Sequence, residues 1–344
     1  MPSLKEIKGR IASVSSTLKI TSAMKMVASA KLHKAQAAIG NMLPYEQRLS
    51  RILAHLLAVS EQPAGAVQQA DSSSQKNRGY APQNQPAARQ DAESVNQIGT
   101  ETSGQYVPSD EHIPQSLARR EERSVLTEDN SVRRVAVVAF SSNSSLCGGF
   151  NAAVIRKTLA VVKKWEQEGA KVTVFSVGRK MAEAMRKAGH PTPADYTKLA
   201  DSPSYDGAAA LADTLIAAFD EGRFDRVELV YNHFRSTASQ PTQYEVYLPF
   251  SADSLPEAAP ADYILEPSRE ELIAQLVPTF QRLRIYTTLL DANAAEHAAR
   301  TVAMQTATDN GNNLLQELTL EYNKSRQQKI TSEILDLVGG TLQQ

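Results

Sequence analysis

Residues 269–338 read REELIAQLVPTFQRLRIYTTLLDANAAEHAARTVAMQTATDNGNNLLQELTLEYNKSRQQKITSEILDLV, and this stretch decides the fold. Helix-favouring residues dominate it, and Pro278 is its single proline. We therefore predict one continuous helix. At about 1.5 Å per residue, its ~70 residues would span roughly 100 Å, far more than the usual helix of a globular domain. The sequence thus predicts a rod.

Local signals mark both ends of this predicted helix. Ser268 precedes Glu271 by three positions, which is the spacing of a capping box that satisfies free backbone N–H groups. Gly339-Gly340 follows Val338 and predicts the end of the helix. We also expect Pro278 to kink the first turns, because proline removes a helical hydrogen bond and clashes with the preceding turn.

One face of the predicted helix repeats at alternating spacings of four and three. The residues on it are Leu290, Ala294, His297, Thr301, Met304, Thr308, Gly311, Leu315, Leu318 and Tyr322. This 3.5-residue period keeps one seam facing a partner helix. Many of these side chains are small or polar, and alanines are frequent between 292 and 307. The seam therefore predicts a slim shaft that a neighbouring helix can approach closely.

The first 57 residues predict the partner helix. Leu4, Ile7, Ile11, Val14 and Leu18 share the three-four spacing. We expect the stripe then to shift phase to Ile20, Met24 and Val27, and Pro44 to interrupt the helix. Since long amphipathic helices gain most of their stability by burying an apolar face, the two terminal helices should pair antiparallel. We expect them to form a coiled coil.

Composition limits the classes of function. The 344 residues are 42% hydrophobic and carry a formal net charge of -1, so the total charge favours no polyanion. The first 45 positions are nevertheless basic, which suits a solvated face or an acidic partner surface. Nucleic acid is disfavoured because aromatic residues do not alternate with these lysines. No stretch is apolar enough to span a membrane, so we expect a cytosolic protein or one peripheral to a membrane.

The middle of the chain divides into two parts. Residues 58–130 lack leucine between Leu57 and Leu117 and are rich in polar residues, which predicts a mostly disordered insertion. Residues 131–250 alternate strands and helices, and 251–344 hold a linker and the C-terminal helix. The predicted strands are 134–140, 171–177, 226–234 and 243–248, and the predicted helices are 151–168, 179–187 and 206–221. They predict a small Rossmann-like α/β domain with a largely parallel sheet and one antiparallel edge.

The turn Ser144–Asn151 (SSLCGGFN) lies where phosphate-binding loops occur in α/β domains. It lacks the glycine spacing of a dinucleotide fingerprint and the Gly-Lys-Ser/Thr of a P-loop. We therefore expect a tight turn with Asn151 capping the following helix. Cys147 has no neighbouring histidine to act as its base, and the six histidines show no metal-ligand spacing. No catalytic residue, cofactor site or metal site is predicted.

Several segments together resemble the gamma subunit of F-type ATP synthases. They are LKITSAMKMVA at 18–28, LCGGFN at 146–151, EHAARTVAM at 296–304, ATDN at 307–310 and LEYNKSRQQKITSEI at 320–334. The resemblance covers roughly 1–57 and 131–340 in colinear order and leaves out the insertion. One departure is Asn143-Ser144-Ser145, which stands where the family commonly has Asp-Arg-Gly.

The resemblance implies a central-stalk rotor that couples proton-driven ring rotation to cycling of the beta catalytic sites. It implies contacts with the alpha and beta subunits, the epsilon subunit and the c-subunit ring, with no catalytic residue in this chain. It further implies a peripheral protein on the cytoplasmic face of a bacterial inner membrane. Met24 and Lys25 fall where the family's N-terminal helix passes acidic levers of beta. Arg326, Gln327 and Thr331 fall where its C-terminal helix meets loops of beta and alpha. The loop Gln240–Glu245 would lie near the ring.

Two other classes remain open from the residues alone. One is a nucleotide-binding α/β enzyme with helical oligomerisation arms, and the other is an unrelated coiled-coil adaptor. Micromolar binding of ATP or a dinucleotide by the purified chain would favour the enzyme. The sequence leaves open the transported ion, proton or sodium, together with the ring size, the net direction of the reaction and the purpose of the insertion.

Overall fold

The computed structural model describes residues 3–58, 132–251, 255–256 and 265–341. Its elements in chain order are α1 (Leu4–Ala58), β1 (Arg134–Phe140), α3 (Phe150–Gln167), β2 (Lys171–Val177), α4 (Arg179–Lys187), α5 (Thr197–Asp201), α6 (Tyr205–Asp220), β3 (Arg226–Asn232), β4 (Thr242–Leu248) and α7 (Arg269–Thr341). The insertion predicted at 58–130 lies outside the described residues apart from Ala58, which ends α1.

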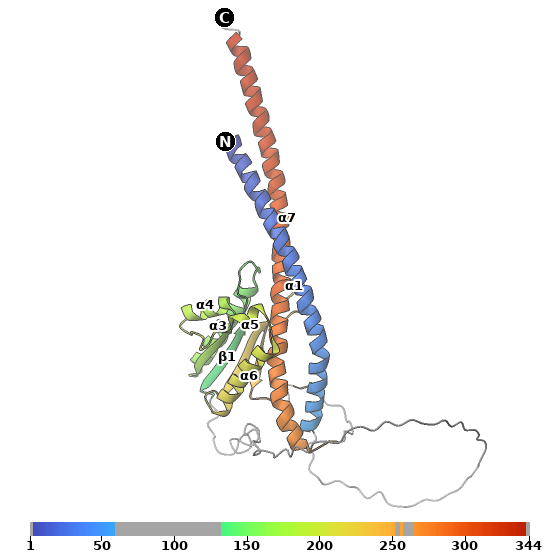
Figure 1. Cartoon of the computed structure of the whole chain (residues 1–344). Coiled ribbons are helices and arrows are strands. Elements are labelled where there is room, and N and C mark those ends of the chain that lie inside the picture. Colours follow the sequence, from blue (N-terminus) through green and yellow to red (C-terminus); the bar gives the residue numbers. More distant parts are fainter. Residues whose placement is uncertain (1–2, 59–131, 252–254, 257–264, 342–344) are drawn as a thin grey trace, which may run out of the picture.

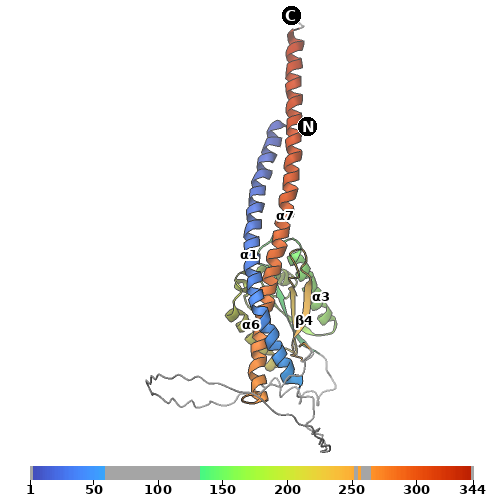
Figure 2. The ribbon, with the colours of Figure 1, turned by 90° about the vertical axis from the view of Figure 1, so that its right-hand side faces the viewer.

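The two terminal helices lie side by side and run antiparallel, so that both chain ends lie at the same end of the molecule (Figures 1 and 2). We call this pair the shaft. At mid-height the hydroxyl of Thr308 donates to the hydroxyl of Thr21 at 3.0 Å. A turn further along, a Cβ added to Gly311 would lie 2.7 Å from Leu18, so the two helices approach closely at this glycine. Helix α7 extends past the start of α1 (Figure 2).

The seam predicted on α7 is confirmed, since each of its ten positions is buried or half-buried. On α1 the predicted stripe is confirmed from Leu4 to Leu18, but the predicted phase shift is wrong. The buried side continues with the same period through Thr21, Lys25, Ala28, Leu32 and Ala35. Ile20, Met24 and Val27 are 56%, 40% and 59% exposed. The buried side of α1 therefore follows the helical period rather than the most apolar residues, which lie on the exposed side here.

The helix ends follow the prediction at one end only. The Ser268 hydroxyl accepts from the backbone N–H of Glu271 at 3.2 Å, as the capping motif predicts. The predicted stop at Gly339-Gly340 is wrong, because α7 continues to Thr341. A glycine lowers helix propensity by about 1 kcal/mol relative to alanine but does not forbid the conformation.

Neither proline ends its helix. Pro44 does not interrupt α1, contrary to the prediction, and Pro278 lies within α7. Beyond Pro44, Leu49, Leu53 and Leu56 pack with α7 in one buried cluster. This apolar burial outweighs the hydrogen bond that the proline lacks.

The α/β domain is built on a four-stranded sheet of order β2-β1-β3-β4. Strand β1 pairs parallel with β2 and β3, and β4 pairs antiparallel with β3, which confirms the predicted sheet type. Alternate residues of β1 face two separate cores. Val135 and Val137 pack with α3 and α4, whereas Ala136 and Val138 pack with α6 on the opposite face. Helices therefore cover both faces of the sheet.

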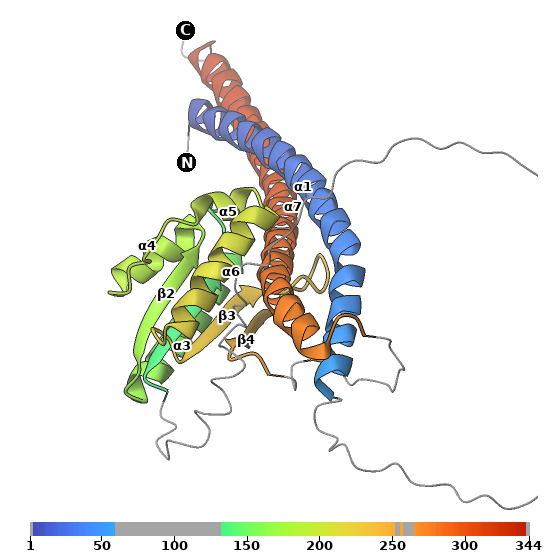
Figure 3. The ribbon, with the colours of Figure 1, turned by 60° about the horizontal axis from the view of Figure 1, so that its bottom comes forward.

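Helix α7 is part of this domain as well as part of the shaft. Its residues Ile285, Leu289 and Ala292 belong to the same buried cluster as Phe140, on the sheet face that α6 covers. Its other side packs on α1, where Leu32 and Ala35 meet Ala294 and Ala298. Helix α7 thus lies between the α/β domain and α1 (Figure 3). The domain is fixed to the shaft by a shared hydrophobic core.

Some boundaries differ from the sequence expectations. Helix α5 was not predicted, and β3 ends at Asn232 rather than at residue 234. The segment Gln240–Glu245, predicted as a loop, is mostly strand, because β4 begins at Thr242. The turn between the last two strands therefore spans 233–241.

A buried carboxylate lies in the centre of the sheet. Glu228 on β3 is 0% exposed, which the apolar pattern of that strand does not predict. Its oxygens accept from Trp165 Nε1 at 2.8 Å, Arg226 Nε at 2.7 Å and the Tyr244 hydroxyl at 2.6 Å. Three donors on two oxygens satisfy the carboxylate, and they tie α3 and the edge strand β4 to β3.

Candidate functional site

The first group of predicted contact residues lies on the extended part of α7. Arg326, Gln327 and Thr331 are all exposed. The Thr331 hydroxyl donates to the backbone carbonyl of Gln327 at 2.9 Å, within the same helix. Arg326 thus presents a planar, permanently charged guanidinium that can hold a carboxylate with two parallel hydrogen bonds.

The second group lies on α1. Met24 is 40% exposed, and with Ile20 and Val27, four and three residues away on the same side of the helix, it forms an exposed apolar surface that we call the α1 outer face. Lys25 is half-buried, since it falls on the seam side of the helix. Three large exposed apolar side chains on one side within two turns form a patch rather than the scattered apolar residues of an ordinary surface.

The structure does not bring the five predicted residues into one site. Ser3, Leu4 and Lys5 at the start of α1 lie beside Ser325 and Lys329 of α7. Met24 is twenty residues further along α1, which is about 30 Å at the helical rise. The candidate contacts therefore form two levels along the shaft.

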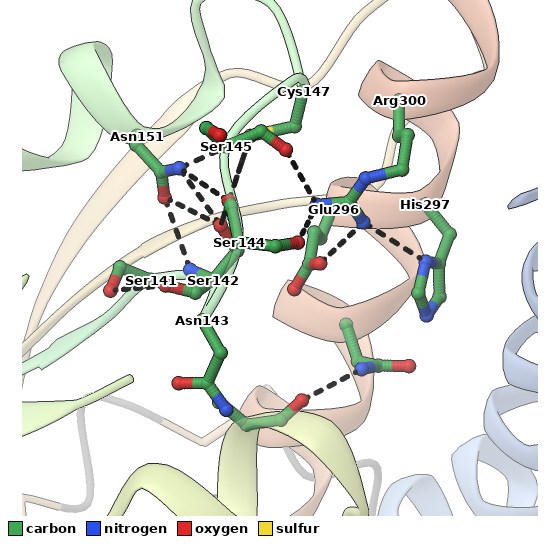
Figure 4. Close-up of polar contacts among 12 residues, drawn as sticks. Ser141, Ser142, Asn143, Ser144, Ser145, Cys147, Asn151, Glu296, His297 and Arg300 are labelled. Atoms are coloured by element: carbon green, nitrogen blue, oxygen red, sulfur yellow. Dashed lines mark hydrogen bonds and ion pairs between the residues drawn. The ribbon is translucent and has the colours of Figure 1, made fainter. Parts of the chain in front are cut away.

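A third polar region lies where the turn after β1 meets α7, and Figure 4 shows its side chains. Arg300 donates from Nη2 to the hydroxyl of Ser144 at 2.7 Å and from Nη1 to Glu296 at 2.5 Å. On the other side of the turn, the Asn143 amide donates to the carbonyl of Thr197 in α5 at 2.7 Å. The turn thus connects the shaft to the α/β domain.

The side chain of Asn151 does not cap α3, contrary to the prediction. Gly149 is the N-cap and makes no side-chain cap bond. The Asn151 Oδ1 accepts from the Ser142 backbone N–H at 3.1 Å, and its Nδ2 donates to the Ser142 hydroxyl at 2.8 Å. Cys147 Sγ lies 3.1 Å from the same Nδ2 (Figure 4). Asn151 lies inside the first turn of α3, so its side chain reaches back to shape the loop.

The turn is therefore occupied by its own side chains. Leu146 has φ 66° and Gly148 φ 58°, so the chain reverses through two left-handed residues. Cys147 is 2% exposed. With Ser142, Cys147 and Asn151 bonded to one another in front of α3, this arrangement favours a structural turn over a phosphate cradle.

Two buried titratable residues, Glu296 and His297, lie about one turn before Arg300 on α7. Burial raises the pKa of Glu296, although Arg300 partly offsets the rise. Burial, with the positive charges of Arg300 and Lys31, lowers the pKa of His297 to about 4. The ring is therefore neutral near pH 7, and its Nδ1 lies 3.5 Å from Arg300 Nη1.

Further polar links between the α/β domain and α7 escaped the sequence analysis. They join Arg282 to Asp213, Arg284 to Glu245, Asp291 to both His233 and the backbone N–H of Phe234, and Asn293 to the carbonyl of Ala200. Their positions on α7 are spaced by two to seven residues and follow the side that faces the domain. A run of polar residues on the flank of an apolar seam was the only sequence signal for them.

Two further features are absent from the described residues. No cluster of three or more histidine, cysteine or acidic side chains in that part of the chain could hold a metal ion. Among the described helices, none has a stretch both long and apolar enough for crossing a membrane.

Comparison with known proteins gave consistent matches. The sequence profile of the family described as ATP synthase matches residues 3–342. An ATP synthase gamma chain from Phocaeicola vulgatus is 45% identical over 347 residues, covering 99% of this chain and 100% of the relative. Another, from Bacteroides fragilis, is 44% identical over 348 residues, with coverage of 99% and 100%.

Two solved structures are similar in fold. One is a chain of the Euglena gracilis mitochondrial ATP synthase (OSCP/F1/c-ring, rotational state 3), with TM-score 0.54, 18% identity and coverage of 98% of this chain and 93% of that chain. The other is a chain of the rotor of the same synthase in rotational state 1, with TM-score 0.52, 16% identity and coverage of 95% and 98%.

Proposed function

We propose, from the premise that this chain belongs to the ATP synthase gamma-chain family, that it is the central-stalk rotor of an F-type ATP synthase. In this role it transmits rotation between a membrane ring of c subunits and the catalytic sites of the beta subunits. The chain itself contributes no catalytic residue and acts as a non-catalytic subunit of the complex.

The observation that carries this proposal is the asymmetry of the molecule along its length. At one end α7 is enclosed between α1 and the α/β domain, and at the other it extends with exposed side chains. Such a molecule has a part that can be held rigidly and a part that can touch surrounding subunits. Both are needed to transmit torque.

Rotation can drive catalysis only through differential contact. A shaft shifts the equilibrium of a beta site by as much as its interaction free energy differs between the alternative conformations. At the height where Thr308 bonds to Thr21, α1 exposes the apolar Ile20 and Met24, whereas α7 exposes the polar Asp309 and Asn310, so the described shaft differs from side to side. Each orientation would therefore present a different chemical surface to the same subunit.

We assign the two contact levels to different partner surfaces. Arg326, Gln327 and Thr331 would meet loops of beta and alpha at the top of the shaft. Met24 and Lys25 would pass acidic levers of beta lower down. The α/β domain would bind the epsilon subunit and rest on the c ring. In this arrangement the protein is peripheral to the cytoplasmic face of a bacterial inner membrane, and the paired helices act as an antiparallel coiled coil.

The polar links to α7 explain how the domain could pass torque to the shaft. Arg300, Asp291 and Arg284 each bond to the domain at a different height. Together with the shared apolar core they resist sliding and rotation of the domain against α7. If bonds held the domain to α7 at only one height, the domain could rotate relative to α7 before the shaft itself rotated.

The proposal is tested with the full chain co-expressed with the alpha and beta chains of its own organism. We expect a stable complex in which a bead attached to the α/β domain rotates during ATP hydrolysis. A complex that hydrolyses ATP at the full rate with no rotation of this chain would contradict the proposal. Micromolar ATP binding by the purified chain would instead support the nucleotide-binding enzyme.

A further inference from the structure

A cavity lies where α1, α7 and the edge of the sheet meet, away from both contact levels of the shaft. Its volume is about 460 Å³, within the usual range for small-molecule sites. Ile39 and Met42 of α1 and Leu290 of α7 give it apolar walls. Pockets between domains and between packed helices are common places for ligands.

The polar part of the cavity is built around Arg284. Its guanidinium donates to Glu46 on α1 at 2.9 Å and to Glu245 on β4 at 2.6 Å. Burial by itself would lower the pKa of Arg284, but Glu245 and Glu46 outweigh it and raise that pKa. One cation is thus shared by two carboxylates that come from two different parts of the molecule.

The charge of the cavity is negative. Glu46, Glu245 and Asp291 line it against a single guanidinium, and His233 is the remaining basic side chain on its wall. His233 Nδ1 lies 2.7 Å from Asp291 Oδ2, so these two side chains are already hydrogen-bonded to each other. The acidic groups exceed the basic ones whether His233 is neutral or protonated, and the cavity therefore favours a cation.

Two oxygens on the wall have no partner among the described residues. The Thr288 hydroxyl is buried in a residue that is 3% exposed, Glu245 Oε1 is buried as well, and both residues line the cavity. A buried polar atom without a partner costs roughly 1–3 kcal/mol. A carboxylate oxygen needs a donor, and a hydroxyl can donate or accept.

We propose that this cavity binds a small organic monocation, a primary ammonium group carried on a short apolar body. The ammonium would donate to Glu245 Oε1 and to the Thr288 hydroxyl, and the apolar body would lie against Ile39, Met42 and Leu290. A neutral alcohol of the same shape could donate one hydrogen bond but would bring no positive charge to the excess of carboxylates. A metal ion would leave the apolar walls without a partner.

Such a ligand would touch all three parts that meet at the cavity. By filling the space between α1, α7 and β4 it would stiffen the junction of the domain with the shaft. This consequence rests on the proposed rotor function, whereas binding itself depends only on the residues of this chain. Ligand binding can therefore be disproved without disproving the rotor function, and the rotor function can be disproved without disproving ligand binding.

The test is calorimetric titration of the purified full chain with 4-phenylbutylamine, with the isosteric alcohol 4-phenylbutan-1-ol as the neutral control. We expect saturable binding at one site per chain with a Kd below about 1 mM, and at least tenfold weaker binding of the alcohol. Thr288→Val keeps the shape of the wall and removes the hydroxyl. Glu245→Gln removes the charge. Each should weaken amine binding about fivefold or more.

Asp213→Asn is the matched control, because Asp213 also pairs with an arginine of α7 but does not line the cavity. It should bind the amine like the parent chain. Equal binding of amine and alcohol would overturn the proposal, as would no saturable binding up to about 10 mM. Parent-like binding by Thr288→Val would overturn it too, and this variant is informative even if Glu245→Gln does not fold.

Discussion

Helix α7 consists of two regions with opposite surroundings. In the basal region, residues 269–300, Ile285 is 0% and Leu289 3% exposed, because the α/β domain covers one side and α1 the other. In the distal region, residues 301–341, Leu320 is 71% and Leu337 73% exposed. The same helix is thus the core of a domain at one end and a presented surface at the other.

This difference separates stability from function along a single element. Side chains in the basal region contribute to the free energy of unfolding through burial. Outside the seam that faces α1, where Met304 and Leu318 are buried, side chains in the distal region contribute little to that free energy and are available to partners. The same substitution at an exposed distal position and a buried basal position should therefore change the free energy of unfolding little in the first case and strongly in the second.

The largest expected effect comes from breaking the helix where the two regions join. Proline at Ala299 removes a helical hydrogen bond and clashes with the preceding turn, which costs about 3 kcal/mol or more. The distal region would then no longer continue the axis of the basal region. We expect ATP-driven proton pumping to be lost even in complexes that assemble. Normal pumping would show that a continuous shaft is unnecessary.

The same substitution in each region measures the difference directly. Leu289→Ala should lower the free energy of unfolding by about 2–5 kcal/mol, because it leaves a cavity in the core that α7 shares with the sheet. Leu320→Ala should change it by no more than about 0.5 kcal/mol. Urea unfolding of the two variants checks this pair. Equal losses would mean that the distal region is buried in the isolated chain.

The basal region should also be the acid-sensitive one. His297 has its pKa lowered from 6.5 to about 4 in the folded chain, so between these values the unfolded chain binds more protons. Stability should therefore fall as the pH drops through this window, by up to about 1.4 kcal/mol per pH unit. His297→Gln, which keeps an acceptor for Arg300, should flatten the profile. An unchanged profile would assign the acid sensitivity elsewhere.

Much of this architecture was predictable because it is local. The start of α7 follows from Ser268, the seam follows from spacing, and the four strands follow from short apolar runs bounded by turns. The order of strands along the chain also predicted the antiparallel edge correctly. These features depend on residues close together in sequence.

The errors have physical causes of two kinds. On α1, Ile20 and Val27 are more apolar than Thr21 and Lys25 but lie on the exposed side, so the hydrophobic pattern indicated the wrong face. Elsewhere the decisive contact was distant in sequence, as in the bond from Arg300 to Ser144 across 156 positions. A single sequence carries no signal for such a contact.

Of the predicted contact residues, Met24, Arg326, Gln327 and Thr331 are exposed, while Lys25 is half-buried. Their roles stay predictions, because exposure alone does not identify a partner. The cavity around Arg284 was not predicted. Its residues come from three elements that the sequence places far apart.

The smallest expected effect on stability belongs to the most direct test of the account. Replacing both Arg326 and Gln327 with alanine, the best helix former, should change the free energy of unfolding by less than about 0.5 kcal/mol. Arg223→Ala with Gln167→Ala is the matched control, since it makes the same chemical change at exposed positions on the α/β domain.

The measurement is steady-state ATP hydrolysis at saturating ATP by the purified complex that contains each double variant. If Arg326 and Gln327 contact beta more strongly in one rotational state than in another, losing a charge-assisted hydrogen bond should slow hydrolysis about tenfold to a hundredfold. The control complex should hydrolyse ATP like the parent. A rate within about a factor of two of the parent for the shaft variant would contradict the account, because the distal surface would then touch its partners without affecting catalysis.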